Sequence, residues 1–116
     1  MTRPVGTTDG TVDGIDVDRV AAVVLACRAV AGLAGGAGGR GTYLPGRRVP
    51  GVVIQEPTGS GPATIEVHVI ARYGPTMSEV AGQVRAALAV LAPGSPVDVV
   101  VEDLATAPEP AGSVPG

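Results

Sequence analysis

The segment 63-ATIEVHVIARYGPTMSEVAGQVRAALAVLAPGSPVDVVVEDL-104 is the main determinant of the fold, because two strand patterns flank one helix pattern. Alternation over 63–73 puts every second residue on an apolar face and the intervening residues on a more polar face. Residues 96–104 alternate in the same way, with three valines on one side. A strand, a helix and a strand in this order form a crossover unit, so we expect two parallel strands, adjacent or separated by a third.

The helix pattern between these strands has a start, a face and an end. Thr76 and Glu79 have the spacing of a capping box, in which each side chain accepts a hydrogen bond from the other residue's backbone N–H. An apolar stripe follows at helical spacing: Met77, Val80, Ala81, Val84, Leu88 and Leu91. Pro93 and Gly94 end the helix. Gly82, at its middle, is consistent with close packing against a neighbouring helix or with neutral drift.

Upstream, 16-DVDRVAAVVLACRAVAGLAGG-36 has the periodicity of a second helix, expected over 18–31 and ended by Gly32. Asp16 or Asp18 suits its N-terminus, and its apolar stripe would bury Cys27 as an inert thiol. Short extended segments are expected at 33–35, 41–48 and 51–56, and Pro45 and Pro50 indicate edge positions or bends. The predicted fold is therefore α+β, a two-layer sandwich with a small mixed sheet and two helices on one face.

Length and composition predict one domain. Of the 116 residues, we expect 1–14 and 105–116 to be disordered tails, because both are rich in Gly, Pro, Thr and Ser, and 15–104 to form the domain. The chain contains no Phe or Trp, so its core must be built from Val, Ala, Leu and Ile. The single cysteine excludes an internal disulfide and a cysteine-based metal site.

Charge and hydropathy exclude further classes. The net charge of −3 is unlike the basic footprint of a DNA-binding protein. The longest apolar run, 20–27, is far shorter than the ~20 residues of a membrane span, and the N-terminus lacks a secretion-signal pattern. We therefore expect a cytoplasmic protein without direct membrane insertion.

The stretch 35-GGAGGRGTYLPGRRVPG-51 contains the spacing G-x-G-x-x-G at Gly36, Gly38 and Gly41. A dinucleotide-binding loop of this type leaves a strand and opens a helix, because the helix N-terminus binds the phosphate. Here a helix precedes the loop and an extended segment follows. The absence of lysine excludes a Walker motif, and we expect a flexible connection with no bound cofactor.

The same stretch displays Arg40, Arg47 and Arg48 with Tyr43 between them. This set is a possible interaction surface for an acidic protein, a phosphate or anionic headgroups. An alternative function is a small RNA-binding module that uses this arginine-rich loop, although such modules normally add stacking aromatic residues. A solvated loop is the simpler interpretation.

His68 lies on the polar face of the first strand with Glu66 and Arg72, and Asp98 and Glu102 share one face of the last strand. A histidine with two carboxylates could serve as a metal site or an acid–base pair. Exposed sheet faces also carry ordinary cross-strand charge pairs. With one histidine for every possible catalytic set, we predict no catalytic residues and no metal site, and hence a protein that is not an enzyme.

The pattern resembles the alkaline-shock-protein family, also called the Gls general-stress or envelope-stress-response family. In that family a hydrophobic strand ends in an aromatic–glycine pair, which is matched in this chain by Tyr73 and Gly74. The helix that follows in the family has a valine–alanine stripe and leads to a valine-rich strand, matched by 79–84 and 97–101. The opening 15-IDVDRVAAVVLACRAVAGLAGG-36 also resembles the family's first helix, so the likeness covers about 15–104.

This resemblance implies a non-catalytic cytoplasmic protein of cell-envelope homeostasis. Family members self-associate as oligomers and act as scaffolds. They are held at the inner face of the membrane through a small membrane-embedded protein partner. The resemblance assigns no binding residues and no role to the segment 35–62.

Overall fold

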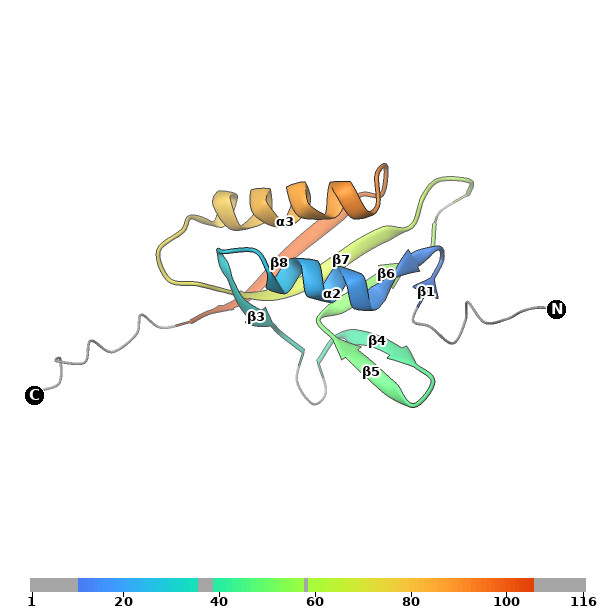
Figure 1. Cartoon of the computed structure of the whole chain (residues 1–116), viewed down its shortest axis with the longest axis horizontal. Helices are drawn as coiled ribbons and strands as arrows, with labels where there is room; N and C mark the ends of the chain where they lie inside the picture. Colours follow the sequence, from blue (N-terminus) through green and yellow to red (C-terminus); the bar gives the residue numbers. More distant parts are fainter. Residues whose placement is uncertain (1–10, 36–38, 58, 106–116) are drawn as a thin grey trace, which may run out of the picture.

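The computed structural model describes residues 11–35, 39–57 and 59–105. Figure 1 shows two helices lying over one face of a twisted sheet, with a separate hairpin projecting beside it. The α+β class predicted from the sequence is confirmed. The elements run in the order β1 (Thr11–Val12), β2 (Ile15–Asp16), α2 (Val17–Leu25), β3 (Val30–Leu33), β4 (Gly41–Leu44), β5 (Arg47–Pro50), β6 (Val52–Gln55), β7 (Thr64–Ala71), α3 (Met77–Leu91) and β8 (Val97–Leu104).

Strand β7 is the centre of the main sheet. Strand β8 runs parallel to it along one edge, with Ile65 opposite Val97, so the expected crossover brings the two strands into direct contact. Strands β6 and β3 follow one another along the other edge, and both are antiparallel to β7. The sheet is therefore mixed, as predicted.

The core lies between this sheet and the helices. The predicted apolar face of β7 is fully buried at Ile65, Val67 and Val69. Helix α3 contributes Val80, Val84 and Leu88, and α2 contributes Val17, Val20 and Val24, all at zero exposure. Small aliphatic residues thus fill the space that larger aromatic residues occupy in many domains.

Helix α3 follows its sequence signals closely. The Glu79 backbone N–H donates to the Thr76 hydroxyl (3.1 Å), and the Thr76 N–H donates to the Glu79 carboxylate (2.7 Å), which completes the capping box. Two expectations are wrong. Met77 is 47% exposed, because it is the first residue of the helix and lies before the part of the helix that packs on the sheet. A Cβ added at Gly82 would meet no heavy atom within 4 Å, so close packing does not explain this glycine.

Helix α2 is shorter than the predicted 18–31. It begins after Asp16, whose side chain accepts from the Arg19 N–H (3.1 Å), and it ends at Leu25. The chain then turns into β3, where Val30 is buried opposite Ala71 of β7. The reason is tertiary: β7 offers unpaired backbone groups, and a β-branched valine satisfies them better in a strand than in a further helical turn.

The other segment boundaries also changed. The expected extended segment 41–48 is a hairpin, in which Pro45 and Gly46 form the turn between β4 and β5. Residues 11–14, assigned from sequence to the N-terminal tail, form β1 and its turn to β2. Residues 1–10 and 106–116 lie outside the described residues.

Cys27 lies in the turn after α2 and is only partly buried, so its predicted place within a helical stripe is wrong. Its Sγ lies 3.5 Å from the Val23 carbonyl oxygen and 3.7 Å from that of Gln83. Burial raises the pKa of the Cys27 thiol. Because the thiolate is the reactive form, we expect an aromatic disulfide reagent at neutral pH to modify the native protein several-fold more slowly than the urea-unfolded chain. Equal rates would show that the thiol is not shielded.

Candidate functional site

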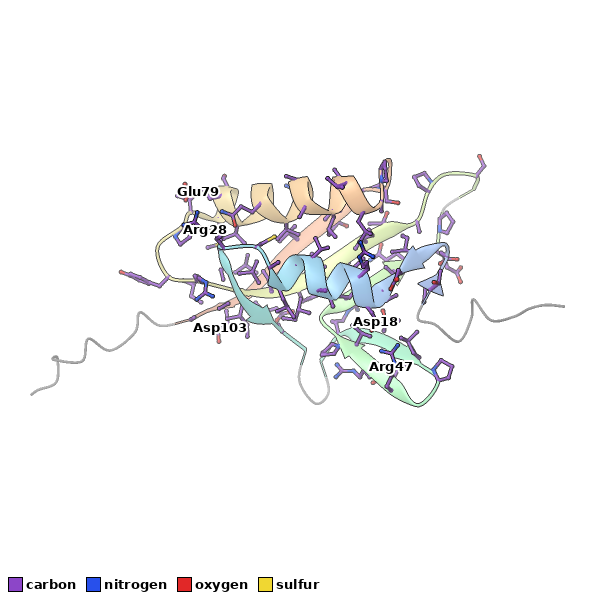
Figure 2. All side chains as sticks on the ribbon, viewed as in Figure 1. Asp18, Arg28, Arg47, Glu79 and Asp103 are labelled. Atoms are coloured by element: carbon purple, nitrogen blue, oxygen red, sulfur yellow. The ribbon has the colours of Figure 1, made fainter. Side chains whose placement is uncertain are left out.

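The arginine-rich hairpin is held against α2 by an ion pair. Figure 2 shows Arg47 and Asp18 pointing toward one another, from β5 and from the first turn of α2. The two Nη atoms of Arg47 lie 2.8 and 2.7 Å from the two Asp18 carboxylate oxygens, a bidentate geometry that favours arginine over lysine. Both side chains are nearly half exposed, so solvent weakens the pair.

The Arg47–Asp18 pair makes a small contribution to the stability of the native state, and this contribution depends on pH. The hydrogen bond from Arg47 holds the pKa of Asp18 below its ordinary value of 3.8. A lowered carboxyl pKa stabilises the native state above that value, and the contribution is lost as pH falls through the native-state pKa. We expect Asp18→Asn to lower stability slightly at neutral pH and to match the wild type below the native-state pKa. Urea unfolding of the wild type and the variant from neutral pH to below this pKa tests the prediction, with Asp13→Asn as the control. A stability difference between wild type and Asp18→Asn that grows toward low pH contradicts it.

Arg48 is surrounded by the carbonyl groups of the glycine-rich loop. Its Nη2 lies 2.6 Å from the Gly35 carbonyl oxygen, 2.7 Å from that of Gly39 and 3.2 Å from that of Arg40. A phosphate-binding loop presents N–H groups to an anion. Here the described part of the loop presents oxygens to a cation, which is the opposite polarity. Gly36 and Gly38 of the glycine motif lie outside the described residues.

The other two residues of the predicted surface differ in their surroundings. Arg40 Nη2 lies 3.3 Å from a Glu66 carboxylate oxygen, although the Arg40 side chain is 55% exposed. Tyr43 is 76% exposed, and the Arg48 guanidinium carbon lies 5.6 Å from its ring centroid. Each of the three arginines therefore has an intramolecular partner. An external anion would have to compete with those contacts, and Tyr43 is the most exposed of the four side chains.

The only histidine lies between two carboxylates on the sheet face away from the helices. His68 Nδ1 lies 2.5 Å from a Glu102 carboxylate oxygen across β7 and β8, and Nε2 contacts Glu66 on its own strand. Gln55 from β6 contacts the other oxygen of Glu66. The histidine is 6% exposed and the Glu66 side chain is 12% exposed. The cluster thus joins three adjacent strands.

The sequence suggested this cluster only in part. Strand alternation predicts that Glu66 and His68 share a face and that Glu102 lies near them, and both carboxylates do contact the His68 ring. Arg72 and Asp98 were considered with them, but no contact of either with the cluster is found among the described residues. Glu102 lies two residues beyond Val100, the partner of His68 in the ladder, at the point where the register of β8 shifts by one extra residue. No local pattern in the sequence signals that shift.

The contacts of the cluster tie β6, β7 and β8 together. Each ring nitrogen of His68 faces a carboxylate, and which nitrogen donates depends on the tautomer of the ring. Within 11–35, 39–57 and 59–105, no group of three or more His, Cys, Asp and Glu residues is placed to hold a metal ion.

A hollow of about 400 Å³ lies at the other end of the molecule, between the β1–β2 turn and the end of α3. Its lining includes Asp13, Asp16, Ala63 and Leu91. The Asp16 carboxylate is engaged as the cap of α2. Ser95 also lies in the lining, which contains no histidine, cysteine or basic residue among the described residues.

Comparison with protein-family models, curated proteins and solved structures found no significant match to this chain. No helix among the described residues is both long enough and apolar enough to span a bilayer.

Proposed function

We propose that the chain is a non-catalytic scaffold protein of the cell-envelope stress response, which self-associates and is held at the cytoplasmic face of the membrane by a membrane-embedded protein partner. The sequence resemblance over 15–104 supports the proposal. So does the fold, because the helix–strand pattern that carries the resemblance forms the central unit from β7 to β8.

The main observation in favour of the proposal is the eight-residue strand β8, which pairs only with β7 among the described strands. Unpaired edges of this length are sites where other chains add to a sheet. Large apolar side chains are also exposed at separate places, with Tyr73 at 68% and Val90 at 84%. Because singly exposed apolar residues are ordinary on protein surfaces, the open edge of β8 is the feature that suits a protein that binds other proteins.

The test combines cell fractionation with the mass of the purified protein. Native membranes are separated from cytosol, the chain is located by antibody, and purified protein is examined by size-exclusion chromatography with light scattering. We expect oligomers, and a membrane fraction that is released by detergent together with a bound membrane protein. A strictly monomeric protein with no partner-dependent membrane fraction would contradict the proposal.

The RNA-binding alternative has no observation in its favour within the described residues. Arg40, Arg47 and Arg48 contact carboxylates or carbonyl groups of the same chain. A salt-dependent shift of labelled single-stranded RNA, lost in an Arg47→Ala/Arg48→Ala variant, would revive it.

A further inference from the structure

The outer edge of β8 has a short window of free backbone groups. In a parallel ladder, alternate residues direct both N–H and C=O toward the same neighbour. The Pro96 carbonyl oxygen bonds to β7 at 2.9 Å, so alternation from Pro96 directs the N–H and C=O groups of Val99 and Val101 away from β7. Ala105, beyond the register shift that follows Val101, bonds to β7 again through its N–H at 2.8 Å. No other strand in the described part of the chain covers the outward groups of Val99 and Val101.

Both ends of this window are closed by side chains. Arg85 Nε of α3 donates to the Val97 carbonyl oxygen (3.1 Å), and the Leu104 N–H donates to the Asp103 carboxylate (2.8 Å). The register shift after Val101 also bends the strand at that end. The edge is thus protected except at its centre, where an added strand has four groups to pair with.

The two faces beside the window differ in chemistry. On the helix side, a groove of about 370 Å³ begins at the end of β8 that Arg85 closes, and it is lined by Arg85 and Ala89 of α3, by Ala92, by residues 94–96 and by Val97. On the opposite side, Asp98 and Glu102 flank Val100, which is 37% exposed, and the Glu102 carboxylate also contacts His68. Asp103 follows at the end of the strand (Figure 2). An added strand would therefore meet apolar surface on one face and carboxylates on the other.

In the antiparallel register centred on Val100, charge favours a different partner over a second copy of this chain. Antiparallel pairing of two β8 strands about Val100 would place Asp98 of each copy opposite Glu102 of the other. Like charges directly opposite one another destabilise a strand pair. A segment with lysine or arginine at those positions would instead be attracted.

We infer that the outer edge of β8 binds an extended cationic segment of a partner protein, in which basic residues alternate with small apolar residues. The basic side chains lie against Asp98 and Glu102, and the apolar side chains enter the groove beside α3. Val99 and Val101 supply the main-chain hydrogen bonds, as in strand addition to other sheet edges. The inference rests on the proposed scaffold function for the existence of a cellular partner, and it names the chemistry of that partner.

The probe is a blocked, fluorescein-labelled nine-residue peptide in which lysine alternates with valine, titrated into the full chain and followed by fluorescence anisotropy. One control peptide has N-methyl groups on alternate residues, which keep the charge but prevent strand pairing; another has glutamate in place of lysine. We expect only the first peptide to bind, and expect it to slow hydrogen exchange at Val99 and Val101. Equal binding of the N-methylated peptide, or protection elsewhere only, overturns the inference.

Matched variants locate the site. Val99→Pro removes one outward N–H and leaves the bonds to β7, so we expect binding about tenfold weaker. Asp98→Lys should weaken binding about fivefold, because a carboxylate opposite lysine becomes a like charge. Glu56→Lys, an equal change of charge at an exposed site beyond β6, should have no such effect. If Val99→Pro fails to fold by circular dichroism, Asp98→Lys decides; binding unchanged in Asp98→Lys overturns the inference.

The two proposals fail separately. A peptide that binds at β8, with a chain that stays monomeric and cytosolic, contradicts the scaffold function and leaves the edge site standing. A membrane partner that is still retained by the Asp98→Lys variant contradicts the edge site and leaves the scaffold function standing.

Discussion

We expect Gly51→Ala to destabilise the protein by about 3 kcal/mol or more. Gly51 stands where β3 ends and β6 begins along the same edge of β7, with φ at 80°. A Cβ there would lie 2.6 Å from the Ala34 carbonyl oxygen and 2.9 Å from that of His68. A positive φ costs roughly 1–2 kcal/mol for a residue with a Cβ, and overpacking adds about 1–3 kcal/mol.

The neighbouring backbone cannot move aside without losing hydrogen bonds. The Ala34 N–H donates to the His68 carbonyl oxygen, and the His68 N–H donates to the Gly51 carbonyl oxygen, both at 2.8 Å. The junction between the two edge strands is therefore held on both sides. For a domain of this size the loss corresponds to a fall in Tm of roughly 12–24 °C.

Gly46→Ala is the matched control. Gly46 has the same φ of 80°, but a Cβ there meets nothing within 4 Å. We expect it to cost only the conformational strain, about 1 kcal/mol. Urea and thermal unfolding followed by circular dichroism measure both variants. Equal losses would show that crowding at the strand junction contributes nothing.

The second large effect is expected for His68→Ala, which we predict to lower the free energy of unfolding by about 2–3 kcal/mol, because it removes a buried hydrogen-bond partner of two carboxylates. The change leaves the Glu66 carboxylate, 12% exposed, without its buried histidine neighbour and breaks the bridge to Glu102 on β8. Arg40→Ala removes the other basic partner of Glu66. Because that arginine is 55% exposed, we expect a loss below about 1 kcal/mol.

A double variant separates charge from packing. Adding Glu66→Gln to His68→Ala replaces the remaining carboxylate with a neutral amide. We expect part of the lost stability to return, because a mostly buried carboxylate that keeps only Arg40 and Gln55 as partners costs more than a neutral amide. The buried position of the cluster would contribute nothing if His68→Ala cost no more than Arg40→Ala in urea unfolding.

The candidate site was predictable to a lesser degree than the fold. The sequence places His68 and Glu66 on one face of a strand, because side chains two apart in a strand share a face. The partner Glu102 lies 34 residues farther along the chain, and its contact depends on the parallel pairing of β7 with β8. The three arginines were expected to display their charge, whereas the fold gives each an internal contact. Their partners come from α2, from β7 and from loop carbonyls, which no local pattern specifies.

Local signals in the sequence are sufficient to specify the central unit of this protein. Period-two alternation in 63–73, the capping box at Thr76 and Glu79 and the valines of 97–101 each act between residues close in the chain. The remaining features depend on tertiary contacts: the residues after Leu25 form β3 rather than helix, and Gly51 becomes the junction of two strands. They do so because β7 has a second edge whose backbone groups must be paired, and only the folded chain brings the distant segments that pair with it.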